Sequence, residues 1–158
     1  MRAPGRHPCR LPLSPADLLR YAGRLSGPLL DRIDLYVQAE RLTADELAGV
    51  APAEPTAEVR PRVLAARARQ RDRQGTENAR LPPASLAASC RPTRAAQRTL
   101  NVAVDRLALS ARGFHRALRV ARTVADLAGC DLVEEHHVRE ALSLRQLPII
   151  GDREAQLA

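Results

Sequence analysis

The clearest hydrophobic pattern in the chain runs over residues 111–128. Apolar residues recur there at steps of three and four, which places them along one face of an α-helix, and Ser110 stands before them as an N-cap. The apolar face comprises Phe114, Ala117, Leu118, Ala121, Val124, Ala125 and Ala128. Charged positions recur at the same steps on the other face. The pattern therefore predicts an amphipathic helix with Arg119, Arg122 and Asp126 on its solvated side.

Shorter patterns predict six further helices. Thr43 with Glu46 three residues later has the form of a capping box, and Gly75 closes a helix that begins near Arg60. Proline costs ~3 kcal/mol in a helix interior, so we place Pro61 in the first turn of that helix. The predicted ranges are 14–24, 43–49, 60–74, 82–90, 93–107 and 133–145.

One stretch, residues 33–39, has the composition of a β-strand. The chain is therefore predicted to be mainly α-helical, and a sheet-based enzyme is not expected. Residues 1–13 are basic and proline-rich and predict a disordered lead. Residues 50–59 predict a linker between a first part, 14–49, and a helical body, 60–147, and residues 148–158 predict a frayed tail.

The composition excludes two kinds of catalytic chemistry that depend on lysine. All 25 Lys and Arg residues are arginine, so the chain can supply neither the lysine of a Walker A loop nor a Schiff base. No run of the Walker B type is evident either. One Phe, two Tyr and no Trp imply an aliphatic core.

The formal net charge of +7 favours an anionic partner, with nucleic acid the leading candidate. The arginines between Arg60 and Arg73 could form a ridge that follows DNA phosphates, with Arg67, Arg69 and Arg71 as its centre. A solvated helix in an arginine-rich protein is the equally weighted alternative.

The three cysteines are far apart and odd in number. We expect Cys9, Cys90 and Cys130 to be free thiols, and no spacing of Cys and His predicts a metal site. No segment has the length and hydropathy of a membrane span or a signal peptide, which predicts a cytoplasmic protein without membrane contact.

Residues 24–37, RLSGPLLDRIDLYV, hold one arginine in a fixed apolar frame. Leu30 and Ile33 flank Arg32 closely, and Gly27 with Pro28 sets a turn before it. An arginine held in this way suits a phosphate contact, although a surface arginine at a helix end is the simpler alternative.

This segment, with SGPLLDRIDL at 26–35, resembles the magnesium-chelatase and MCM-like branch of the AAA+ ATPases, and within it the ComM/YifB family. Residues 109–129, LSARGFHRALRVARTVADLAG, are similar to a second pattern of that family. The resemblance implies that residues 14–49 are the end of an AAA+ core and that 60–147 are its helical lid. Relatives commonly carry a cysteine cluster before the first motif, of which only Cys9 remains here.

The resemblance also implies roles for single residues. Arg32 would be the arginine finger that reaches ATP in a neighbouring subunit, and Arg112, or else Arg116, would be sensor 2. ATP and Mg²⁺ would be bound mainly by a core with Walker motifs outside this chain. The ring would be a homo-oligomer, a hexamer, that processes DNA by branch migration during natural transformation. The chain would then be the C-terminal part of such an ATPase and not catalytic alone. A freestanding basic DNA-binding module and a truncated gene product with an unpaired strand edge remain open alternatives.

Overall fold

The structure is a computed structural model that describes residues 32–37, 39, 42–49 and 53–145. Its helices are α3 (Ala44–Ala48), α4 (Thr56–Gln74), α5 (Pro83–Cys90), α6 (Arg94–Arg106), α7 (Ala111–Leu127) and α8 (Glu135–Ser143), with a short 3₁₀ helix, η1, at Asn78–Arg80. The mainly α-helical prediction is confirmed. The chain divides into two compact units, and the described residues from Ile33 onward all belong to one of them, residues 33–147.

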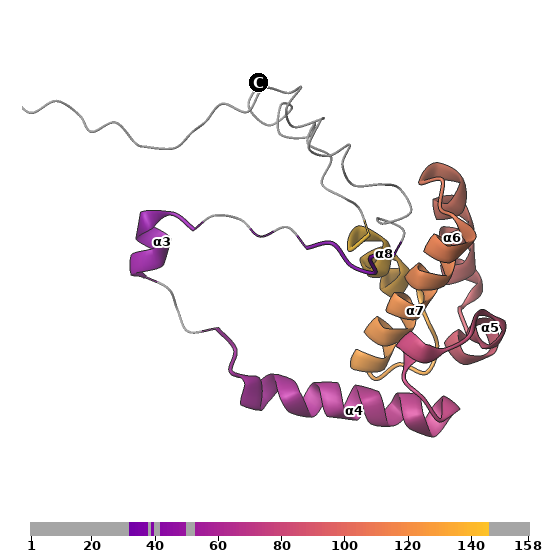
Figure 1. Ribbon diagram of the computed structural model, residues 1–158, viewed down its shortest axis with the longest axis horizontal. Helices are drawn as coiled ribbons and strands as arrows, with labels where there is room; N and C mark the ends of the chain where they lie inside the picture. The colour runs from indigo at the N-terminus through magenta and orange to yellow at the C-terminus, as the bar shows by residue number, and fades with distance from the viewer. Residues whose placement is uncertain (1–31, 38, 40–41, 50–52, 146–158) are drawn as a thin grey trace, which may run out of the picture. The chain divides into compact units, whose positions relative to one another are not determined.

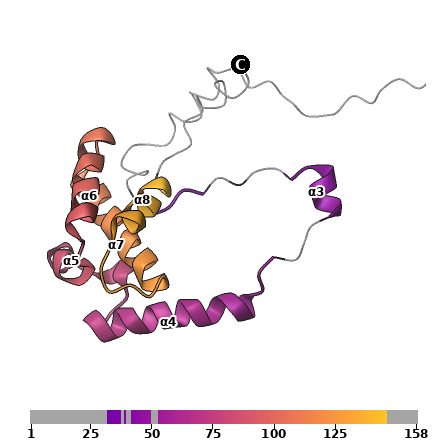
Figure 2. The ribbon, with the colours of Figure 1, turned by 180° about the vertical axis from the view of Figure 1, so that it is seen from behind.

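Helix α7 is the centre of this unit. It contacts α4, α5, α8 and η1, and α8 in turn packs on α6. Figures 1 and 2 show α5, α6 and α8 gathered around α7, with the second half of α4 alongside it. Helix α7 lies at the centre because it offers the longest apolar face for other helices to cover.

The core is aliphatic, as the composition predicts. Buried side chains come from four helices, α5 to α8, and their connections, and Phe114 packs at the edge rather than in the centre. They are Leu81, Leu86, Cys90, Ala96, Leu100, Ala103, Ala117, Leu118, Ala121, Ala125, Val133, Val138, Ala141 and Leu142. The many alanines let the helices approach closely. Each helix–helix contact therefore buries little area, but little empty space remains between the packed helices.

Local signals fix most of the helix ends. The Ser110 hydroxyl accepts a hydrogen bond from the Gly113 amide at 3.0 Å, which confirms the predicted N-cap of α7. Thr93 caps α6 in the same manner. Gly75 has the left-handed φ of 74° and donates its amide to the Arg71 carbonyl at 2.7 Å, which ends α4 as predicted.

Helix α4 begins earlier than expected. It begins at Thr56, within the range predicted as a linker, so Pro61 lies inside the helix rather than in its first turn. The proline removes one hydrogen bond, to the carbonyl of Ala57. Since Ala57 is exposed, that carbonyl is able to hydrogen-bond to water, which reduces the cost of the early start.

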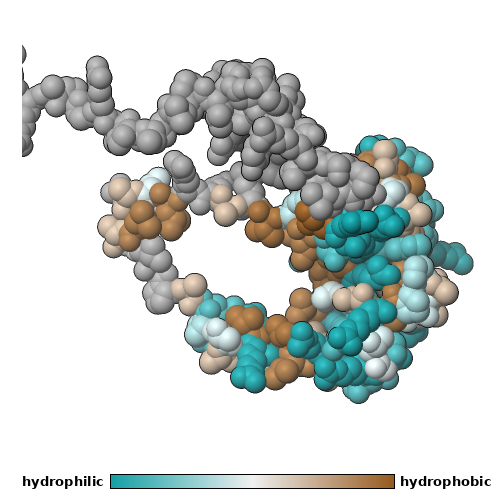
Figure 3. Space-filling model, viewed as in Figure 1, coloured by the Kyte–Doolittle hydropathy of each residue, from teal (hydrophilic) through white to brown (hydrophobic). Residues whose placement is uncertain are grey.

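The predicted strand is wrong for the described part of residues 33–39, which contains no strand. A strand needs a neighbour to complete its hydrogen-bond ladder, and the described residues supply none at this position. Ile33, Leu35 and Val37 are 37, 46 and 80% exposed. Figure 3 shows hydrophobic residues in brown at several places on the surface that it draws. The predicted lead 1–13, helix 14–24 and tail 148–158 lie outside the described residues.

A basic hollow on α7 and a buried ion-pair network

The first half of α7 carries a cavity of about 300 Å³ that we call the basic hollow. Helical spacing brings positions 112, 115, 116 and 119 to one side of α7, where Pro83 of α5 closes the space. Its lining is Pro83, Arg112, His115, Arg116 and Arg119. The two residues predicted as sensor 2 candidates therefore lie together in one site.

The three arginines of the basic hollow differ in how they are held. Arg112 is exposed. Arg116 is half-buried and forms an ion pair with Asp34, and Arg119 donates to the Leu81 carbonyl at 2.7 and 3.2 Å. Arg119 was predicted to be solvated, and this is wrong because a backbone acceptor at the end of η1 takes its guanidinium.

The chemistry of the basic hollow suits an anion with several oxygens. Three guanidinium groups and one imidazole line it, and guanidinium binds phosphate through paired N–H donors. The lining contains no carboxylate, so its donor set does not fit Mg²⁺, which prefers oxygen ligands. His115 packs edge-on against Phe114 with ring centroids 5.7 Å apart.

Residues that follow Arg32 are attached to the helical body beside the hollow. The Tyr36 amide donates to the Leu144 carbonyl at 2.6 Å, and Arg145 donates to the Ile33 carbonyl at 3.2 Å. Together with the Asp34–Arg116 ion pair, these contacts tie residues 33–36 to the first half of α7 and to the residues that follow α8. Arg32 itself is an exposed turn residue and belongs to the other compact unit.

The second half of α7 contains a buried ion pair that the sequence pattern placed in solvent. Arg122 is 0% exposed and Asp126 is 2% exposed, and Arg122 Nη2 lies 2.9 Å from Asp126 Oδ1. The prediction that both are solvated is wrong. Their i, i+4 spacing is the one local signal for the pair, but it is equally common on exposed helix faces.

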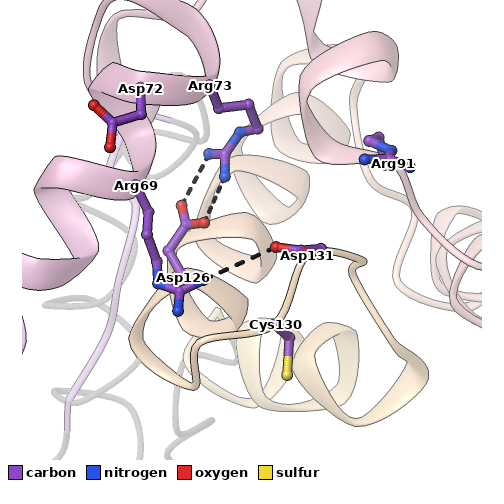
Figure 4. Close-up of a pocket in the computed structure, with 7 residues that line it drawn as sticks. All are labelled: Arg69, Asp72, Arg73, Arg91, Asp126, Cys130 and Asp131. Carbon is purple, nitrogen blue, oxygen red and sulfur yellow. Dashed lines mark hydrogen bonds and ion pairs between the residues drawn. The ribbon is translucent and has the colours of Figure 1, made fainter.

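Asp126 has further donors from the segment that precedes α5. Figure 4 shows Arg73 of α4 pointing at Asp126, with its two guanidinium nitrogens 2.6 and 3.0 Å from the two carboxylate oxygens. Asn78 of η1 adds a bond of 2.8 Å. Burial by itself would raise the pKa of Asp126, but the hydrogen bonds from Arg73 and Asn78 and the charge of Arg122 lower it below its ordinary value.

Arg122 also joins parts of the backbone that are far apart in sequence. Its guanidinium donates to the carbonyls of Asp131 at 2.8 Å, of Cys130, and of Cys90 at 3.4 Å. Burial lowers the pKa of Arg122 while Asp126 opposes the shift. The same burial raises the pKa of the Cys90 thiol to about 11, so Cys90 is protonated at neutral pH. Arg122 is thus a structural cation at the junction of α4, α5 and the α7–α8 connection.

Two of the three arginines at the centre of the predicted DNA ridge on α4 contact other residues of the chain. Arg69 donates to the Gly129 carbonyl at 3.1 Å and lies 3.9 Å from Asp131, and Arg71 pairs with Glu77 at 2.9 Å. Arg67 is exposed. Figure 4 shows Arg69 turned toward the α7–α8 connection. Arg69 lines a cavity of about 430 Å³ whose wall also contains carboxylates and two further arginines.

Several other expectations concern single chemical groups. Cys90 and Cys130 are free thiols as predicted, and Cys9 lies outside the described residues. Across the described ranges, His, Cys, Asp and Glu nowhere form a group of three that could hold a metal ion. No helix in the described part of the chain is both long and apolar enough to cross a membrane.

Comparison with known proteins connects both halves of the sequence to one family. Residues 53–145 match the family described as "Magnesium chelatase, subunit ChlI C-terminal", and residues 5–47 match "Magnesium chelatase, subunit ChlI". The first match covers α4 to α8, and with them the basic hollow and the buried ion-pair network.

Curated relatives share this similarity over most of the chain. Competence protein ComM of Haemophilus influenzae is 38% identical over 135 residues, 85% of this chain and 26% of the relative. YifB of Escherichia coli is 38% identical over 135 residues, 85% of this chain and 27% of the relative. An uncharacterised protein of Mycobacterium tuberculosis is 43% identical over 150 residues, with shares of 88 and 29%. The chain thus spans little more than a quarter of the length of these relatives.

Proposed function

The chain belongs to the family of the magnesium chelatase subunit ChlI, and we propose on this premise that it acts as the C-terminal part of a ComM/YifB-type AAA+ ATPase. In this proposal it does not bind ATP alone. It supplies two arginine functions to an assembly whose Walker motifs lie on residues outside this chain.

The first function is the arginine finger. We assign it to Arg32, which is exposed and stands in the segment SGPLLDRIDL that matches the family. A guanidinium placed at the γ-phosphate of a neighbouring subunit stabilises the charge that develops in phosphoryl transfer, which is worth ~10³–10⁵ in rate. The role requires a ring in which one subunit reaches the nucleotide of the next, and a hexamer is the ring we propose.

The second function is sensor 2, and the basic hollow is the observation that carries it. Arg112 and Arg116 share one cavity with a third arginine and no carboxylate, and this is an arrangement for phosphate oxygens. We assign the contact to Arg112 first, because it is exposed while Arg116 is paired with Asp34. The bound nucleotide would carry its own Mg²⁺, held by carboxylates of the ATPase core and not by this lid.

The wider setting follows the relatives. One of them is named a competence protein, which supports a role in DNA processing during natural transformation, with branch migration as the proposed reaction of the ring. The net charge of +7 agrees with DNA as a partner. A cytoplasmic location is part of the same proposal.

Two substitutions test the two arginine functions in an assembly of this chain with a ComM-type core. Arg32→Ala should lower ATP turnover by about 10³-fold and leave nucleotide binding intact, since the finger acts on the transition state. Arg112→Ala should weaken the coupling between the bound nucleotide and the lid, and with it the ATPase response of the assembly. Turnover and nucleotide affinity are measured separately, the first by phosphate release and the second by a fluorescent ATP analogue.

The matched control is Arg98→Ala on α6, an exposed arginine away from both motifs. It should change neither quantity. If Arg32→Ala abolished nucleotide binding, the finger assignment would be wrong. If Arg112→Ala left the ATPase response unchanged, the sensor role would move to Arg116.

A further inference from the structure

Asp34 belongs to the segment of the proposed arginine finger and contacts the helix that carries the proposed sensor. It lies two residues after Arg32 in the chain, and its carboxylate pairs with Nη1 of Arg116 in the basic hollow. We propose that Asp34 is a positioning residue that competes with nucleotide phosphates for Arg116. The segment after the proposed finger would then respond to occupancy of the hollow, an inference that rests on the proposed sensor function.

Backbone contacts on both sides of Asp34 support this role. Arg145 holds the Ile33 carbonyl at 3.2 Å, and Leu144 accepts the Tyr36 amide at 2.6 Å. The Arg145 side chain also passes close to Gly113 in the first turn of α7, where an added Cβ would lie 3.6 Å from its Nη2. The end of α8 therefore presents Asp34 to the hollow, so the ion pair is part of an organised contact.

The ion pair is suited to being displaced. The Asp34 side chain is 59% exposed and that of Arg116 is 21% exposed, and exposed ion pairs hold their partners weakly. A polyphosphate brings several negative charges and can bind one guanidinium through two oxygens. Arg119, by contrast, is held by a neutral carbonyl, so a phosphate would gain its charge without displacing a carboxylate.

Competition predicts that loss of the Asp34 charge strengthens anion binding. The probe is inorganic triphosphate, titrated calorimetrically into the full chain at constant ionic strength. Asp34→Asn should bind about two- to fivefold more tightly than the native chain, the factor expected for release of a partly exposed ion pair. In the Arg116→Gln background the same change should have no effect, because the residue competed for is absent.

Glu54→Gln is the matched control. Glu54 also forms a partly exposed ion pair, with Arg62 at 2.6 Å, and its loss changes the net charge by the same amount at a place away from the hollow. Triphosphate affinity should stay at the native value in this variant. Equal gains for Asp34→Asn and Glu54→Gln would overturn the competition and leave only a general charge effect.

Triphosphate binding by the native chain and its variants separates this inference from the proposed function. If the native chain binds triphosphate and Arg112→Gln weakens binding, the hollow is an anion site. An unchanged affinity in Asp34→Asn would then overturn the role of Asp34 alone. If no variant binds triphosphate, the competition at Arg116 is overturned, whereas the sensor function of Arg112 and the finger role of Arg32 are tested separately by ATP turnover in the assembly with the core.

Discussion

The two halves of α7 use arginine in opposite ways. In the first half, Arg112 is exposed, and Arg116 lines a cavity while pairing with the partly exposed Asp34, which is not part of the cavity lining. In the second half, Arg122 is 0% exposed and donates to a buried carboxylate and three backbone carbonyls. The same residue type on the same helix thus lines a cavity in one half and stabilises the fold in the other.

What separates the two halves is the supply of acceptors within the chain. A buried guanidinium is tolerated only where its charge and its five N–H donors find partners, and the turn between α7 and α8 brings several carbonyls to Arg122. In the first half, the described residues supply one backbone carbonyl to Arg119 and one partly exposed carboxylate to Arg116. Arg112 is exposed there, which is the physical basis for proposing a binding role for that half.

Removal of the Asp126 carboxylate should produce the largest loss of stability. Asp126→Ala leaves Arg122 buried without its anion, which costs about 3–5 kcal/mol in the free energy of unfolding. Urea denaturation followed by circular dichroism measures the loss. Asp105→Ala, at an exposed acidic position in α6, is the control and should change the free energy by less than about 0.5 kcal/mol. Similar values for the two variants would contradict the structural role of the pair.

Acid should weaken the buried half of α7 through the same carboxylate. The folded-state pKa of Asp126 is lowered, so its contribution is complete above the unfolded pKa near ~4 and is lost as the pH falls through the lower folded value. The difference in unfolding free energy between the native chain and Asp126→Asn should therefore narrow below about pH 4. Denaturation curves from pH 7 to pH 2 test this, and a constant difference would show that Asp126 does not titrate as described.

Neutralisation of the arginines on α4 should have the smallest effect for each residue changed. Replacement of Arg67, Arg69 and Arg71 by Gln should lower DNA affinity and flatten its salt dependence by at most ~0.9 per phosphate contact. Since Arg69 and Arg71 have acceptors in the chain, we expect Arg67→Gln to account for most of the change. Arg98→Gln removes one positive charge, as Arg67→Gln does, and is the control for that single variant. An unchanged salt slope in the triple variant would assign the ridge to solvated surface.

Much of the fold could be predicted because its signals are local. The caps at Ser110 and Gly75 and the apolar steps of α7 depend on neighbours three and four residues away, and the structure has them as expected. The failures involve partners distant in the chain. Residues 33–37 have the composition of a strand but no strand beside them among the described residues. The early start of α4 is an exception with a local reason, because the carbonyl that Pro61 leaves unpaired belongs to the exposed Ala57.

The residues of the candidate site also fall into two groups, those that helical spacing predicted and those that depend on contacts distant in the chain. Periodicity alone placed Arg112 and Arg116 on one side of a helix, and the structure places both in the basic hollow. Nothing in the local pattern distinguished Arg122 from Arg116, since both are arginines on a charged helix face. The Asp34 contact could not be predicted either, because it joins positions 82 residues apart.

The sequence by itself determined the helical class, the aliphatic core and the absence of lysine chemistry, because these depend on composition and on short-range spacing. Only the tertiary structure decided which arginines are structural and which face a cavity. That decision depends on burial and on acceptors contributed by distant segments. Tertiary packing, rather than residue type or helical phase, therefore fixes the role of each arginine on α7.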